Sequence, residues 1–133
     1  MTVFEFNQTT THNPAVAAAL HDLLRLVAQC TSLPDEPPAR MVRHFDMLFA
    51  LAIRADSSLT RALKTLGEER AMPSASFKAV EDDLLSALSE VKLTLCIPEG
   101  VTDVPDAPHL LRRAKELLDC VPAKLAALEH WPV

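Results

Sequence analysis

The feature that most constrains the fold is a run of seven residues, 47–53, in which no side chain is polar. A run of this length can be a buried strand or part of a buried helix. The composition favours the helix, because aromatic residues make up 5% of the chain and tyrosine is absent. We therefore expect residues 47–53 to lie in a helix at the centre of the core, covered on several sides.

The residues around this run repeat with helical spacing. One stripe is formed by Met41, Phe45, Leu48 and Ala52, and a second stripe beside it is formed by Val42, Phe49 and Ile53. A proline pair at 37–38 offers a start, and we expect this central helix to end near residue 55. Residues 56–58 can then cap a short helix that Gly67 stops in a left-handed conformation. Truncation of Phe49 is expected to be among the most damaging changes.

Capping residues and prolines mark the other helix boundaries. Asn13-Pro14 predicts a first helix, and its outer stripe comprises Ala18, Asp22, Arg25 and Gln29. Pro73-Ser74 opens a regular helix that Pro98 ends, and residues 98–108 are expected to form an exposed loop. A last helix begins near Asp106, and Pro122 should kink or split it.

These signals predict an all-α fold: a single-domain bundle of about five to six helices around a buried central helix. The domain spans residues 1–133, with an extended N-terminal arm at residues 1–13. A chain of 133 residues buries roughly two-thirds of the surface that its unfolded form exposes. We therefore expect it to fold without disulfides or a structural metal.

The charge distribution bears on possible partners. The net charge is −5 and the basic residues are scattered, with Arg112, Arg113 and Lys115 as the densest cluster. Because nucleic acids are bound through concentrated positive charge, we expect no nucleic-acid partner. No stretch approaches the roughly 18 apolar residues of a membrane span, so we expect no membrane span either. The first residues also lack the basic start and apolar run of a signal segment.

The three cysteines, Cys30, Cys96 and Cys120, lie far apart, each near the end of an apolar-periodic segment. We interpret them as buried free thiols in a reducing compartment. This interpretation places the protein inside the cell, in the cytoplasm or an organelle matrix.

The residues that usually carry catalysis or bind metals form no local motif. The five histidines (His12, His21, His44, His109 and His130) include no pair at positions i and i+4 of one helix. His44 is the strongest single candidate, but its place next to Arg43 fits the polar edge of a buried helix. Glu81, Asp82 and Asp83 are consecutive, so on a helix they point in different directions. We therefore expect no catalytic residues, no metal ligands, no cofactor and no enzymatic activity.

Residues 40–90 carry a resemblance to a known family. The long helix with Met47-Leu48, the short helix ending Leu66-Gly67, and Pro73 followed by a regular apolar stripe resemble the middle helices of bacterial globins. The stripe comprises Phe77, Val80, Leu84, Leu85 and Leu88. Globins hold haem iron through a histidine on the short helix, but the matching position here is Leu66 or Arg70. The resemblance therefore implies a haem-free, globin-like ligand-sensing or regulatory domain.

The N-terminal arm is the main functional clue. Val3, Phe4 and Phe6 precede the first predicted helix and so are not part of its apolar stripe. They must fold back on the domain or dock on a partner, as extended apolar segments do by filling pockets with alternate side chains. The first hypothesis is a non-catalytic protein-protein interaction module, a small subunit or adaptor of an intracellular assembly that contacts its partner through these residues. Homo-oligomerisation is left open.

Overall fold

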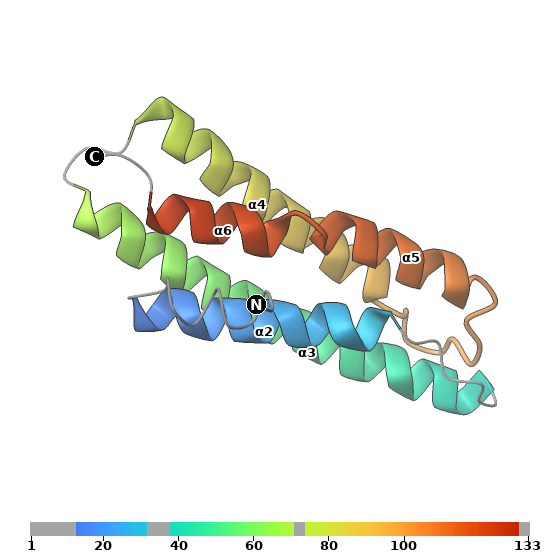
Figure 1. The fold of residues 1–133 in the computed structure, drawn as a ribbon. Coiled ribbons are helices and arrows are strands. Elements are labelled where there is room, and N and C mark those ends of the chain that lie inside the picture. Colours follow the sequence, from blue (N-terminus) through green and yellow to red (C-terminus); the bar gives the residue numbers. More distant parts are fainter. Residues whose placement is uncertain (1–12, 32–37, 71–73, 131–133) are drawn as a thin grey trace.

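The computed structural model describes residues 13–31, 38–70 and 74–130, and every regular element in these ranges is a helix (Figure 1). The elements are α2 (Pro14–Cys30), α3 (Pro38–Glu69), α4 (Ala75–Leu95), α5 (Ala107–Leu118) and α6 (Val121–Glu129). The predicted all-α class is confirmed for these residues. No helix in them is long and apolar enough to cross a membrane.

The five described helices pack as four. Helix α2 contacts α3 and the pair α5–α6, and α4 likewise contacts α3 and the same pair. Figure 1 shows α6 and α5 in one line between α4 and α2, where together they occupy the fourth position. The structure is thus a four-helix bundle in which sequential helices are neighbours. The predicted split near Pro122 is confirmed, since α5 ends at Leu118 and α6 begins at Val121.

The predicted buried central helix is not confirmed. Helix α3 occupies one of the four positions, and only one side of it faces the core. Phe45, Leu48 and Ala52 are fully buried there. On other sides of the helix, Met47 is 41% exposed and Ile53 is 45% exposed. A four-helix arrangement leaves part of every helix facing outward, so the apolar run at 47–53 is only partly covered.

The predicted break after residue 55 is also wrong, because α3 continues without interruption for 32 residues. Two of the three polar residues expected to cap a new helix, Asp56 and Ser58, instead contact neighbouring helices. Lys92 Nζ of α4 lies 2.7 Å from Asp56 Oδ2, and the Ser58 hydroxyl donates to Asp22 Oδ2 of α2. Gly67 lies within the helix and its φ is not positive, whereas Gly100 in the α4–α5 loop has a φ of +87°.

The starts of α2 and α4 follow the predicted capping residues. Asn13 Oδ1 accepts a hydrogen bond from Ala15 N at 2.9 Å, and Pro14 occupies the first turn. Ser74 Oγ accepts one from Phe77 N at 3.1 Å. Each cap satisfies a backbone N–H that has no partner within its own helix, which stabilises the helix start by about 1 kcal/mol.

Arg70 joins the end of α3 to two other helices. Its buried guanidinium donates to Leu128 O of α6 at 2.8 Å and to Leu66 O at 3.2 Å. The same group lies over the ring of Phe77 on α4. At this end of the bundle, Asn13 N also donates to Glu129 Oε2 at 3.3 Å, so the starts of α2 and α4 and the ends of α3 and α6 meet there.

Candidate functional site

Helices α3 and α4 each carry a large apolar side chain that is exposed, Ile53 on α3 and Leu93 on α4. We define the α3–α4 strip as Phe49, Ile53, Leu93 and Cys96. Leu93 is 77% exposed, Ile53 and Cys96 are exposed, and Phe49 is half-buried. Exposed leucines scattered singly are normal, but adjacent ones are typical of interaction surfaces.

The register of the two helices brings these residues together. The ion pair between Asp56 and Lys92 aligns α3 with α4, which runs antiparallel to it (Figure 1). Ile53 lies about one turn before Asp56, and Cys96 lies about one turn after Lys92. In an antiparallel pair, both steps lead in the same direction from the ion pair. Ile53 and Cys96 therefore lie at about the same level along the two helices, and Leu93 lies about one turn before Cys96 on α4.

Part of this strip could be recognised from the sequence. Phe49 and Ile53 belong to the second apolar stripe of α3, which turns out to lie at the edge of the core rather than inside it. Leu93 lies outside the regular buried stripe of α4. Its position in the sequence is therefore enough to predict that this apolar side chain faces outward. The level of Cys96 with Ile53 depends on the α3–α4 register, which no local pattern predicts.

The sequence does not predict a second group of polar side chains, which is centred on Asp22. Asp22 was placed on the outer stripe of the first helix, but its side chain is only 9% exposed. It lies at the boundary with α3, where it accepts the Ser58 hydrogen bond and where Oδ1 lies 3.6 Å from Arg54 Nε. A buried carboxylate is stable only with such donors. The sequence carries no signal for this pairing, because Asp22 and Ser58 lie on different helices.

The cysteines differ from the prediction in two of three positions. Cys30 is buried, as expected, but Cys96 and Cys120 are exposed because each follows the last turn of a helix, where the chain leaves the core. Burial raises the pKa of the Cys30 thiol from 9.0 to about 11. This thiol therefore stays protonated at neutral pH and is a poor nucleophile.

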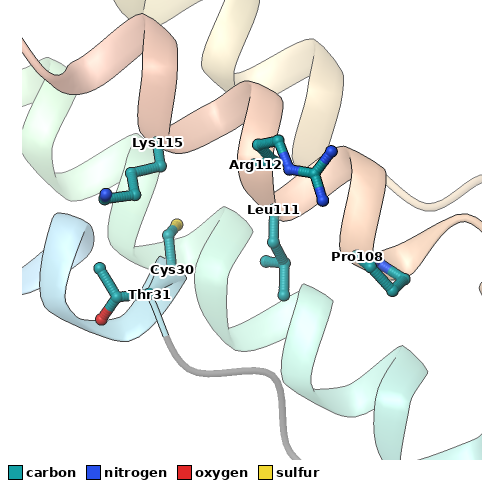
Figure 2. A pocket seen from close by; sticks show the side chains of 6 residues that line it. All are labelled: Cys30, Thr31, Pro108, Leu111, Arg112 and Lys115. Carbon is teal, nitrogen blue, oxygen red and sulfur yellow. The ribbon is translucent and has the colours of Figure 1, made fainter.

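Cys30 lines an open pocket of about 250 Å³ between the end of α2 and α5. Figure 2 shows Cys30 and Thr31 at the end of α2 opposite Leu111 and Lys115 of α5. Despite the nearby Lys115, the pKa of the thiol is raised, because desolvation dominates. The pocket thus holds a protonated thiol among apolar and basic groups, without an acid-base pair.

The remaining candidates from the sequence do not converge. His44 is half-buried with its ring edge toward Phe45, and its Nε2 has no hydrogen-bond partner among the described residues. This position fits the polar edge of a helix. Asp82 and Asp83 are exposed. Val3, Phe4 and Phe6, the predicted partner-binding residues, lie outside the described residues.

Within the described ranges, no group of three or more His, Cys, Asp or Glu side chains is placed to hold a metal ion. The helix break on which the globin resemblance rested is absent, since residues 56–66 continue α3. Leu66 is fully buried, and Arg70 is engaged with backbone carbonyls. No protein-family model matches this chain, and neither a curated protein nor a solved structure matches it.

Proposed function

We propose that this chain is a non-catalytic protein-protein interaction module, a small subunit or adaptor of a larger assembly. The observation that supports this function best is the α3–α4 strip, in which Ile53 and Leu93 are exposed and Phe49 is half-buried. Covering exposed side chains of this size contributes about 25 cal/mol per Å² of apolar area. Binding of a partner to the strip gains this free energy, because the same side chains are exposed to water in the isolated domain.

The proposed partner is a different protein rather than a second copy of the chain. Two copies each carry a net charge of −5, and this like charge disfavours their association. The strip comprises residues of two antiparallel helices, and exposed apolar side chains on neighbouring helices suit the apolar face of a partner helix. Val3, Phe4 and Phe6 of the N-terminal arm are proposed to add contacts to the same partner.

The test uses the full-length protein as bait and identifies the protein that it captures. Binding is then measured between the two purified proteins. Ile53→Asp and Leu93→Asp should each weaken binding, since a charge at the centre of an apolar contact is costly to desolvate. Ala17→Asp is the matched control, because it adds the same charge to an exposed position on α2. Equal binding by all three variants would exclude the strip as the contact surface.

Two further results separate the alternatives. Sedimentation of the purified protein as a dimer that Leu93→Asp dissociates would identify the strip as a self-association surface and contradict the proposed partner. Deletion of residues 1–11 should lower partner affinity more than it lowers the melting temperature. A truncated protein that binds unchanged but melts many degrees lower would assign the arm to the domain core.

A further inference from the structure

The groove between α2 and α3 contains an open pocket of about 400 Å³ on a different side of α3 from the strip. Its lining is mostly polar and comes from both helices: Ala18, His21 and Asp22 of α2, and Arg54, Ser57, Ser58 and Arg61 of α3. This volume is in the range of sites that hold small ligands. The pocket is notable for its arginines, because the chain as a whole is acidic.

The buried carboxylate of Asp22 organises one wall of this pocket. Oδ2 accepts the hydrogen bond from Ser58, and Oδ1 lies 3.6 Å from Arg54 Nε. Both oxygens thus face donors of α3. The contact is made through Nε, and the Arg54 side chain remains 68% exposed. Asp22 therefore holds the arginine at the pocket while most of the Arg54 side chain stays accessible to a ligand.

Arg61 forms the opposite end of the pocket. The described residues include no acidic side chain in an ion pair with it. It follows Arg54 by seven residues, so the two side chains leave the same face of α3 about 10 Å apart along the helix. Ser57 is exposed on the turn between them, and His21 lines the pocket from α2.

The two arginines of this pocket, Arg54 and Arg61, outnumber its single carboxylate, Asp22. Guanidinium groups match oxyanions because they present several N–H donors in a fixed plane. A planar carboxylate is satisfied by the fork of one arginine. In this pocket, guanidinium groups lie at two ends and a serine hydroxyl lies between them. This arrangement of donors suits the tetrahedral oxygens of a phosphate better than the planar oxygens of a carboxylate.

We propose that the α2–α3 pocket binds a phosphate group, with Arg54 and Arg61 as its charged ligands and Ser57 as a hydroxyl donor. The pocket is larger than inorganic phosphate requires, so a small phosphate monoester fits as well as the free ion. This site is independent of the proposed partner surface, because Arg54 and Ile53 are consecutive residues that leave the helix about 100° apart.

The test uses the full-length, ¹⁵N-labelled protein, titrated with sodium phosphate at constant ionic strength and followed by amide chemical shifts. Saturable shifts at His21, Ser57 and Ser58 are expected. Arg54→Ala and Arg61→Ala should each weaken binding about tenfold, the effect of losing one charge-assisted contact. Arg43→Ala removes an exposed arginine of the same helix outside this pocket and should bind phosphate as the unchanged protein does.

Two additional probes define the ligand. Phenyl phosphate that binds more tightly than inorganic phosphate would identify a phosphate monoester as the preferred ligand, whereas tighter binding of inorganic phosphate would identify the free ion. Acetate that binds as well as either would overturn the assignment to phosphate. Chemical shifts that rise linearly without saturation would show that only general surface charge is involved. The same conclusion would follow if Arg43→Ala lost as much phosphate affinity as Arg54→Ala and Arg61→Ala.

Discussion

The guanidinium carbon of Arg70 lies 4.9 Å from the centroid of the Phe77 ring, which couples the end of α3 to the first turn of α4. The same side chain donates to Leu128 O at the end of α6. One buried residue thus holds three helix ends together. Because a charged group donates these hydrogen bonds inside the protein, their loss should be costly.

We expect Arg70→Met to destabilise the protein by about 2 to 4 kcal/mol, since a hydrogen bond from a charged group contributes about 1.5 to 3 kcal/mol and the contact with the ring adds to it. Urea unfolding measures this loss. Arg61→Met is the control, because Arg61 is exposed and surface changes usually stay within about 0.5 kcal/mol. Equal unfolding free energies for the two variants would contradict the assigned role.

Two phenylalanines of α3 differ in burial, because one lies in the core and the other belongs to the strip. Phe45 is fully buried, whereas Phe49 is half-buried at the edge of the α3–α4 boundary. Phe45→Ala should therefore cost about 3 to 5 kcal/mol, as large truncations in cores do, and Phe49→Ala should cost less. Thermal unfolding of both variants tests this order. The reverse order would mean that residues 47–53 are covered after all.

Cys30 gives a prediction for pH dependence. Burial raises the pKa of its thiol from 9.0 to about 11 in the folded protein. Above pH 9 the unfolded chain releases this proton while the folded protein retains it, so the free energy of unfolding falls between pH 9 and about 11. Below pH 9 the contribution is fully present. Cys30→Ala should flatten this part of the stability curve, although it lowers stability below pH 9 by removing a buried side chain.

The same burial predicts unequal thiol reactivity. At pH 8, a soluble disulfide reagent should modify the exposed Cys96 and Cys120 quickly and Cys30 only as the protein opens. Measuring the modified residues by mass spectrometry over time distinguishes them. Three equal rates would contradict the burial of Cys30, and the unfolded protein in urea provides the control for intrinsic reactivity.

The ion pair between Lys92 and Asp56 aligns the strip, yet it should contribute little stability. The two side chains are 30% and 25% exposed, and ion pairs in contact with solvent usually contribute less than about 1 kcal/mol. A double-mutant cycle with Lys92→Met and Asp56→Asn should therefore give a small coupling energy that decreases with salt. A coupling energy that salt does not change would indicate a desolvated pair.

The helix starts at Asn13-Pro14 and Ser74, and the division at Pro122, could be predicted because the signals are local. A side chain that caps its own helix, or a proline that lacks an N–H, acts within a few residues. The break after residue 55 was predicted wrongly for a related reason. Asp56 and Ser58 have the chemistry of capping residues, but α4 and α2 supply their partners, so the helix continues.

The candidate sites depend on tertiary register to different degrees. Phe49 and Ile53 could be assigned to an apolar stripe, but the sequence does not say that this stripe lies at the edge of a four-helix bundle. The burial of Asp22 and the convergence of Arg54 with His21 depend on how α2 packs against α3. Such pairings have no signature along the chain, since each partner looks like an ordinary outward-facing residue.

The hydrogen bond from Asn13 N to Glu129 Oε2 spans 116 residues and has a consequence for the order of folding. Contacts of α2 with α3 and of α3 with α4 close short loops, and such local contacts form quickly. The contacts of α2 with α6 must instead bring the two ends of the domain together, at a higher loop-closure entropy. The transition state for folding should therefore contain α2–α4, with α6 docking afterwards, so substitutions in α6 should mainly accelerate unfolding.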